Sequence, residues 1–336
     1  MPVYVTCGGQ YGSEGKGLLT EWLAGKVDFK WSTTNCGPNS GHTAVLKNDT
    51  KLVTFHLPIT GVLQPQCKIF LNSGAIIDPE KLVDEIESIE QMGFRIQDRL
   101  CIHPNAAVIY KGHKMKEGEG TMADKISSTQ KGVGAALAAK IARGNNIAAN
   151  DSFLKNFVKP IELMKEDGRI AVEVAQGFSL GINQGFYPFC TSRQCTVYQG
   201  LLDAQLPADY FDISKYMVIR TYPIRVGNTV DGYSGGCYAD QRETSWENLG
   251  IAPEYTTVTG RERRVFTWSD QQVKDAIQHN GFPHVILINF AQYDDDAGIV
   301  AKTKMIREFY SYYGLHSPYI LLGYGPKTED MKEWRG

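Results

Sequence analysis

A glycine-rich turn between an apolar strand and a helix constrains this chain more than any other feature of its sequence. Residues 3–7 have the pattern of a buried strand, and residues 18–24 have the pattern of a helix. The segment between them, GGQYGSEGKG at residues 8–17, contains five glycines and Lys16. Glycines let backbone N–H groups approach phosphate oxygens, and the N-terminus of the following helix attracts the same anion. The segment therefore predicts a phosphate-binding turn, the alternative being a tight turn with incidental glycines.

The turn is similar to a P-loop but does not match its pattern. The pattern GxxxxGK[ST] requires glycine at position 10 and serine or threonine at position 17, where this chain has Gln10 and Gly17. We therefore expect a P-loop-like site, with Lys16 as a point charge, and not a P-loop.

Strand and helix patterns alternate along the rest of the chain. Further strands are expected at residues 52–57, 68–72, 169–174, 217–225, 284–290 and 319–322, and helices at 79–86, 134–143, 152–165, 271–279 and 303–313. Asp78 is placed to cap the helix that Pro79 opens. Such alternation predicts an α/β fold with a large, mostly parallel central sheet. We expect residues 1–336 to form a single domain with long loops at about 110–132 and 228–265.

Composition excludes several classes of protein. The formal net charge is -2, which gives no bulk attraction to nucleic acid. The seven cysteines show no CxxC or CxxH spacing, which argues against a disulfide framework or a zinc site. The first residues lack the pattern of a signal peptide, and no apolar stretch reaches the ~20 residues that cross a bilayer. We expect a cytoplasmic protein that binds neither nucleic acid nor membrane.

A second motif, NCGPNSGHT at residues 35–43, contains His42 between a glycine and a threonine. In a glycine-rich turn, the imidazole could reach a ligand and act as a general acid near neutral pH. A lone histidine is as often structural, so this motif alone leaves both interpretations open.

The two motifs resemble the opening of the adenylosuccinate synthetase family, whose members carry GxQWGDEGKG followed by NAGHT. The resemblance continues in order with FHLP at 55–58, SGAIIDP at 73–79, STQKGVG at 128–134, EVAQG at 173–177, YPFCTS at 187–192, TYPIRVG at 221–227, TGRERR at 259–264 and Gly325-Pro326. It covers nearly the whole chain, which is shorter than a typical bacterial member. It implies a P-loop-like nucleotide-binding fold of the adenylosuccinate synthetase type.

The resemblance also implies a reaction, in which a triphosphate phosphorylates O6 of a purine nucleotide and aspartate then displaces the phosphate from C6. Its cofactor would be Mg²⁺, with Ser13 and the Gly41 carbonyl as ligands, and its catalytic residues Ser13, Lys16 and His42. Contacts to the triphosphate would come from Gly12, Glu14, Gly15, Lys16, Gly17, Gly41, His42, Thr43, Asn289, Ala291, Gly325 and Pro326.

The same resemblance implies the contacts of the other two substrates. The purine monophosphate would contact Ser13, Asn39, Ser128, Thr129, Arg143, Gln176, Thr191, Val226 and Arg261. Aspartate would contact Val258, Thr259, Arg261 and Arg263, since the arginine fork suits carboxylates; without the resemblance, the arginines could equally form a solvated loop face. Arg143 would act across the interface of a homodimer.

One departure from the family pattern concerns the purine. Ser13 stands where the family has the carboxylate that takes the N1 proton of hypoxanthine and binds magnesium. A serine hydroxyl is small, uncharged, and both donates and accepts hydrogen bonds. It suits guanine, whose 2-amino group neighbours N1, and resembles the bacteriophage branch of the family, which uses dGMP in the host cytoplasm. Glu14, a bound water or the transferred phosphate could replace the lost base.

A second departure concerns the phosphate donor. The family segment TKLD, whose carboxylate reads the guanine of GTP, aligns with residues 288–291, so that Ala291 replaces the carboxylate. The loss of that group predicts ATP or dATP as donor. The acidic residues 294–296 could instead take over the role, or form a solvated turn.

Three functions follow from these patterns. The first is a ligase that joins aspartate to dGMP with ATP or dATP. The second is a conventional adenylosuccinate synthetase that uses IMP and GTP, against which Ser13 and Ala291 argue. The third is a nucleotide-binding protein without catalysis, against which the retained His42, Lys16 and arginine pair argue.

Overall fold

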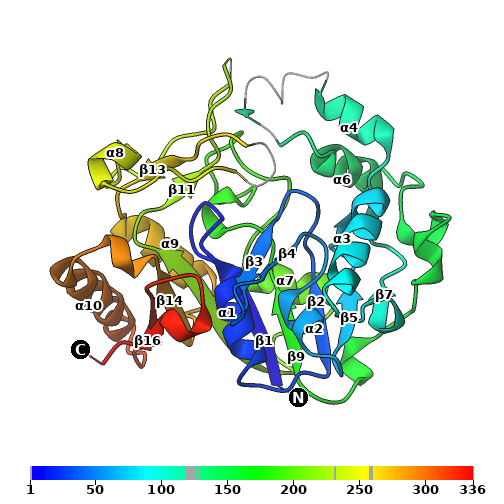
Figure 1. The fold of residues 1–336 in the computed structure, drawn as a ribbon, viewed down its shortest axis with the longest axis horizontal. Coiled ribbons are helices and arrows are strands. Elements are labelled where there is room, and N and C mark those ends of the chain that lie inside the picture. The colour runs from blue at the N-terminus through cyan, green and yellow to red at the C-terminus, as the bar shows by residue number, and fades with distance from the viewer. Residues whose placement is uncertain (1, 119–125, 128, 231, 257–259, 336) are drawn as a thin grey trace.

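The computed structural model describes residues 2–118, 126–127, 129–230, 232–256 and 260–335. Within these residues, one central sheet has the strand order β16-β15-β14-β10-β1-β9-β2-β5-β7 (Figure 1). Its strands are β1 Pro2–Gly8, β2 Trp31–Thr34, β5 Lys68–Leu71, β7 Leu100–Ile102, β9 Ile170–Glu173, β10 Asp212–Arg220, β14 Val285–Asn289, β15 Tyr319–Gly323 and β16 Met331–Glu333. Every neighbouring pair is parallel except β15 with β16. The carboxyl ends of the parallel strands therefore meet at one edge, where ligands bind in open α/β sheets.

Helices cover both faces of this sheet. They are α1 Lys16–Ala24, α2 Ile59–Leu63, α3 Pro79–Gln91, α4 Lys111–Gly118, α6 Val133–Ile141, α7 Val197–Asp203, α8 Trp246–Leu249, α9 Asp270–His279 and α10 Asp296–Tyr312. Short 3-10 helices lie at Gln97–Arg99, Ala148–Asn150, Leu154–Asn156, Leu163–Lys165, Phe178–Leu180, Ala291–Tyr293 and Thr328–Asp330. Three small sheets pair β3 His42–Val45 with β4 Lys51–Thr54, β6 Ile76–Ile77 with β8 Ala107–Val108, and β13 Arg264–Phe266 with both β11 Ile224–Arg225 and β12 Glu243–Thr244.

The alternation of side chains along β1 explains the layers. Val3, Val5 and Cys7 lie in the larger apolar core, together with side chains of α7, α9 and α10. Tyr4 faces the opposite side, where it packs with Leu23 of α1. Successive strand residues face opposite sides of a sheet, so β1 contributes to both layers and sits at the middle of the structure.

Most of the predicted elements are confirmed, including the buried first strand, the mostly parallel sheet and the helix that Pro79 opens. Asp78 occupies the N-cap position of α3, but its side chain makes no capping bond and forms an ion pair of 2.7 Å with Lys114. The predicted strand at 52–57 is shorter, ends at Thr54 and lies outside the central sheet.

The predicted helix at 152–165 is wrong. The structure has two short 3-10 helices there, Leu154–Asn156 and Leu163–Lys165. Pro160 lies between them, and proline removes a backbone donor and disfavours helical geometry at the preceding residue. The predicted strand at 217–225 likewise breaks before Pro223, so that β10 and β11 belong to different sheets.

The two long loops contain more structure than predicted. Helix α4 lies in the 110–132 segment, and β12, α8 and part of β13 lie in the 228–265 segment. Figure 1 shows the second segment on the same side of the sheet as the glycine turn that precedes α1.

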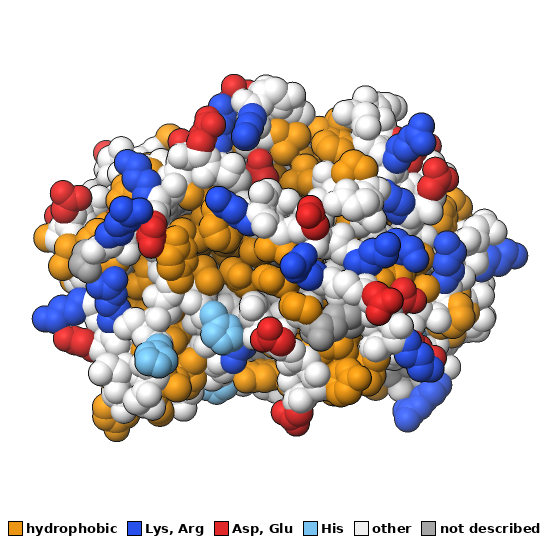
Figure 2. All heavy atoms as spheres, turned by 90° about the horizontal axis from the view of Figure 1, so that it is seen from below, with side chains coloured by type: hydrophobic (Ala, Val, Ile, Leu, Met, Phe, Trp, Pro, Cys, Tyr) orange, Lys and Arg blue, Asp and Glu red, His pale blue; other side chains and the backbone are white. Residues whose placement is uncertain are grey.

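The face seen in Figure 2 carries basic and acidic side chains interspersed among hydrophobic ones. None of the helices in the described part of the chain is long and apolar enough to span a membrane.

Candidate active site

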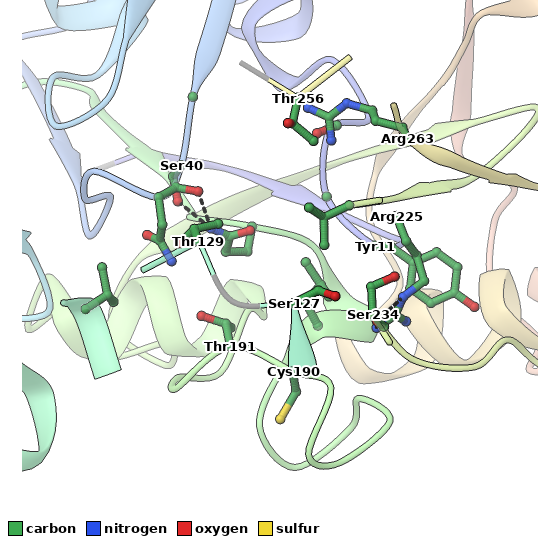
Figure 3. A pocket seen from close by; sticks show the side chains of 18 of the residues that line it. Tyr11, Ser40, Ser127, Thr129, Cys190, Thr191, Arg225, Ser234, Thr256 and Arg263 are labelled. Atoms are coloured by element: carbon green, nitrogen blue, oxygen red, sulfur yellow. Dashed lines mark hydrogen bonds between the residues drawn. The ribbon is translucent and has the colours of Figure 1, made fainter. Parts of the chain in front are cut away.

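A cavity of about 450 Å³ opens at the carboxyl edge of the central sheet. It brings together fourteen of the residues that the sequence singled out. These are Gly12, Ser13, Gly15, Lys16, Gly17, Asn39, Gly41, His42, Thr43, Thr129, Gln176, Thr191, Val226 and Arg263. Figure 3 shows Arg263 beside Thr256 on one side of the cavity, with Thr129 and Thr191 at a distance from them. Elements far apart in the sequence therefore converge on one concave site, as substrate sites require.

The glycine turn is held in shape from inside by Glu14. Its side chain is fully buried, and its Oε1 accepts hydrogen bonds from the backbone N–H groups of Gln10 at 3.0 Å and Gly12 at 2.9 Å. The predicted contact of Glu14 with a triphosphate stays a prediction, but it would have to come from the backbone. Glu14 is also badly placed to replace a base in the cavity.

Two glycines of the turn are required by close packing. A Cβ on Gly17 would stand 2.0 Å from the carbonyl oxygen of Thr43. Gly15 has a φ of 92°, a left-handed conformation that favours glycine. The glycine pattern in the sequence therefore reflects both the shape of the turn and its contact with β3.

Lys16, the first residue of α1, is buried behind the turn. Its Nζ donates to the backbone carbonyl of Gln176 at 2.5 Å and lies 3.3 Å from Oε2 of Glu14. A lysine held in this way presents its charge to the cavity from a fixed position, which suits a phosphoryl group.

His42 is the first residue of β3, where the sequence predicted a turn. Its Nδ1 lies 3.3 Å from Oε2 of Glu173, the last residue of β9, and its Nε2 lies 3.9 Å from Sγ of Cys36. Burial lowers the pKa of His42, but Cys36 and Glu173 outweigh it and raise the pKa above its usual value. The ring is therefore held in place and kept protonated near neutral pH, as a proton donor needs.

Ser13 lies at the mouth of the turn with an exposed side chain and a φ of 57°. Its backbone carbonyl accepts a hydrogen bond of 3.2 Å from Nη1 of Arg220. Arg220 is buried and lies 3.8 Å from the ring centre of Phe290, which also lines the cavity. Ser13 itself lines the cavity with this exposed, small polar side chain.

The sequence missed Arg220 and its partner Glu254. Glu254 lines the cavity, and its carboxylate bonds Arg220 at 2.5 Å and 3.3 Å. The two residues lie 34 positions apart, and no local pattern connects them. The available signal was an arginine directly after the buried apolar run 217–219 at the end of β10, because a buried guanidinium needs a partner.

Arg263 faces the cavity beside this pair. Burial lowers the pKa of Arg263 to about 10, and Glu254 and Arg220 act on it in opposite directions. Its guanidinium remains charged at neutral pH and is available to an anionic ligand.

Several predicted residues do not line the cavity in this structure. They are Glu14, Arg143, Arg261, Asn289, Ala291, Gly325 and Pro326. Ala291 is buried, and Asn289 donates to the Glu14 carbonyl at 3.0 Å, so Asn289 supports the glycine turn. Arg143 is exposed on α6's C-terminal side, and Arg261 donates to the Ser127 carbonyl at 3.3 Å. The remaining predicted contacts, Ser128, Val258 and Thr259, lie outside the described residues.

Residues 294–296 carry structural roles. Asp294 forms an ion pair of 2.6 Å with Lys302, and Asp295 caps α10 by accepting from the Gly298 N–H at 2.6 Å. These contacts favour the interpretation of this acidic run as a turn and helix start.

Comparison with known proteins gives one consistent result. The family model of adenylosuccinate synthetase matches residues 5–162 and 145–300. The N6-succino-2-amino-2'-deoxyadenylate synthase of cyanophage S-2L is 35% identical over 96% of this chain and 90% of its own length. The synthase of the same name from Salmonella phage PMBT28 is also 35% identical, over 96% of this chain and 95% of its own length.

A solved structure agrees with these sequence matches. The cyanophage S-2L succinoaminodeoxyadenylate synthetase, bound to dGMP and dATP as an energy donor, superposes with a TM-score of 0.87 at 32% identity. The match covers 99% of this chain and 95% of the other.

Proposed function

This chain belongs to the adenylosuccinate synthetase family, and on that premise we propose that it joins L-aspartate to C6 of dGMP. ATP or dATP would phosphorylate O6, and the products would be 2-amino-2'-deoxy-N6-succinyladenylate, the nucleoside diphosphate and phosphate. The enzyme is a ligase that forms a C–N bond. We propose that it works in the cytoplasm of the cell that holds these nucleotides.

The observation that carries this proposal is the exposed, neutral side chain of Ser13 at the mouth of the cavity. The 2-amino group of guanine is a hydrogen-bond donor next to N1, and a hydroxyl both fits beside it and accepts from it. The dGMP bound by the cyanophage relative supports the same purine.

In the first step, the glycine turn and Lys16 hold the γ-phosphate while O6 attacks it. The bond from the γ-phosphorus to the leaving diphosphate breaks, and the N1 proton of guanine passes to a bound water. Phosphoryl transfer depends on position and on neutralising the charge of the equatorial oxygens, and the fixed Nζ of Lys16 serves both purposes. His42 donates to O6, first stabilising the attacking oxygen and later the leaving phosphate. Cys36 and Glu173 keep its ring oriented, and together they raise its pKa so that it stays protonated.

Magnesium is the cofactor that the family implies, and the available donors fit it. Magnesium favours oxygen ligands and usually takes only one or two from the protein, the others being phosphate and water oxygens. Gly41 and Ser13 line the cavity, and a backbone carbonyl and a hydroxyl are such oxygen donors. The described residues contain no cluster of three or more His, Cys, Asp or Glu side chains that would hold a metal without phosphate. When bound with the triphosphate, the ion would neutralise charge on the phosphate oxygens.

The dGMP itself would bind along Asn39, Ser128, Thr129, Gln176, Thr191, Val226 and Arg261. Gln176 is held by the Asn39 carbonyl and the Ser40 hydroxyl, both at 2.9 Å, so its amide is fixed before substrate arrives. Arg143 would complete the site of the partner subunit in a homodimer, and its exposure and absence from its own cavity lining support that arrangement.

Aspartate would bind through Val258, Thr259, Arg261 and Arg263. The guanidinium of Arg263 supports this, because Arg263 lines the cavity next to Glu254 and stays charged at neutral pH. The donor base would lie near Asn289, Ala291, Gly325 and Pro326, beyond the ends of β14 and β15. Position 291 is an alanine, which has no carboxylate to accept hydrogen bonds from guanine. This supports an adenine nucleotide over a guanine nucleotide as the phosphate donor.

The test is to identify the product by mass spectrometry. Purified protein is given aspartate and Mg²⁺ with either dGMP and ATP, dGMP and dATP, or IMP and GTP. We expect the aspartate adduct of dGMP with either adenine nucleotide. An adduct from IMP and GTP alone would make the protein a conventional adenylosuccinate synthetase, and nucleotide binding without any adduct would make it a binding protein.

A further inference from the structure

Glu254 lines the cavity but has no assigned role in the two steps of the proposed reaction. Two described residues in the lining of the cavity carry a carboxylate, Glu117 and Glu254. Glu117 is occupied, since it accepts hydrogen bonds from the backbone N–H groups of Gly132 and Gly134 at 2.7 Å and of Ala135 at 3.3 Å. Glu254 makes its side-chain bonds to Arg220, and its side chain is 31% exposed. It is therefore the lining carboxylate that a ligand can reach.

Arg220 fixes where this carboxylate stands. Its Nη1 bonds both the Ser13 carbonyl at 3.2 Å and Oε2 of Glu254 at 3.3 Å. The arginine side chain is 1% exposed and packs over Phe290, so it cannot move away from this place without losing its packing. Glu254 is thus held at the Ser13 end of the cavity.

The backbone places Glu254 beside the proposed aspartate clamp as well. The Arg263 N–H donates to the Glu254 carbonyl at 2.8 Å, and Tyr255 pairs with Glu262 across a short antiparallel bridge. Glu254 therefore lies between Ser13, next to the purine, and Arg263, next to the carboxylates of aspartate. The amine of aspartate must also lie between the purine and Arg263 when it attacks C6.

We propose that Glu254 binds the α-ammonium group of aspartate and accepts its proton. The inference rests on the proposed function and adds the group that activates the nucleophile. Aspartate reaches the site as an ammonium, which has no lone pair, while its two carboxylates are satisfied by arginines. A carboxylate at Glu254 completes the charge pattern, and the arginines around it favour the neutral amine over the ammonium.

One ammonium proton moves to Oε of Glu254, and the freed lone pair forms the N–C6 bond. The C6–O6 bond breaks, its electron pair leaves with the phosphate, and a second proton from the attacking nitrogen goes to that phosphate. The product is a secondary amine, hydrogen phosphate and a protonated Glu254, which returns its proton to solvent.

The experiment separates the two chemical steps in E254Q. Phosphorylation of O6 is followed without aspartate, by positional isotope exchange in [18O]ATP with dGMP, and the second step by formation of the aspartate adduct. We expect isotope exchange within about threefold of the wild type and adduct formation lower by about 10²–10³, the usual contribution of a proton acceptor. E247Q, the same change at an exposed position of α8, is the control and should match the wild type.

Two results overturn the inference. Unchanged adduct formation in E254Q would show that Glu254 has no role in the reaction. An equal loss of isotope exchange and of adduct formation would mean that Glu254 accepts the N1 proton of guanine or stabilises the folded structure. E254D, which keeps the ion pair with Arg220, covers the case in which E254Q does not fold, and should retain exchange while the KM for aspartate rises. A wild-type protein that forms no adduct from dGMP contradicts the proposed function instead, and the same assays are then run with IMP and GTP.

Discussion

The wall of the cavity built by the glycine turn and β3 differs from the wall that includes Glu254, Thr256 and Arg263 in what the carboxylates beside it do. On the first wall, Glu14 and Glu173 are buried. Glu14 accepts from the backbone N–H groups of Gln10 and Gly12 and pairs with Lys16, and Glu173 accepts from the N–H of Thr60 and pairs with His42. On the second, Glu254 is partly exposed and bonds a side chain alone. Because the carboxylates of the first wall bind groups of the protein itself, they make that wall rigid. The carboxylate of Glu254 on the second wall stays accessible to a ligand. Phosphoryl transfer depends on fixed positions of the groups that bind the phosphate. A nucleophile that must lose a proton needs a proton acceptor that it can reach.

The largest expected effect comes from the rigid wall. H42N should lower kcat by about 10³, because it removes the proton donor at O6. Isotope exchange in ATP should fall by the same factor, in contrast to E254Q. H316N, at an exposed position, is the control. If H42N lost adduct formation but kept isotope exchange in ATP, His42 would act only in the second step. The two walls would then not divide the two chemical steps between them.

G17A tests the rigidity of that wall directly. The new Cβ would meet the Thr43 carbonyl, which is backbone and cannot rotate away, so unfolding in urea should show a loss of about 3 kcal/mol. G112A, on α4 where a Cβ meets nothing within 4 Å, should be neutral or slightly stabilising. Equal free energies of unfolding for the two variants would show that the backbone near Gly17 and Thr43 can shift to admit the Cβ, which contradicts a rigid turn.

E173Q sharpens the comparison through pH. The Glu173 carboxylate helps raise the pKa of His42 against the opposing effect of burial, and the protonated ring is the active form. Activity is therefore present below the pKa of His42 and lost as the pH rises through it. Removing the carboxylate lowers that pKa, so the alkaline fall of kcat should begin about one pH unit lower, with about tenfold less activity on that limb. An unmoved alkaline limb would contradict the role of Glu173.

The structure places predicted residues of the first wall in the lining of the cavity, but the sequence missed Glu254 of the second wall, for a physical reason. Residues 8–17 lie between a strand and a helix, so local patterns determine both the turn and the direction of Lys16. Arg220 and Glu254 meet only because β10 ends beside the segment that leads into β13, and spacing does not reveal such a contact. The sequence therefore suggested Glu14 as a substitute base, while the structure buries Glu14 inside the turn.

The same distinction holds for the fold. The buried strands and amphipathic helices were found because burial imposes their periodicity. The predicted helix at 152–165 failed because Pro160 interrupts a segment whose apolar residues pack through short turns. Ala291 was aligned with a base-reading residue, yet its side chain is buried, and burial of this kind depends on the whole sheet.

The central claim is that the neutral side chain at position 13 selects guanine, and S13D tests it most directly. Aspartate tolerates the left-handed conformation of Ser13, so the change should leave the turn intact. The measurement is the ratio of kcat/KM for dGMP to that for IMP in S13D and in the wild type. We predict that S13D lowers this ratio by at least about tenfold, since the longer carboxylate side chain takes the space beside the hydroxyl that the 2-amino group of guanine would occupy. An unchanged or higher ratio would contradict the claim.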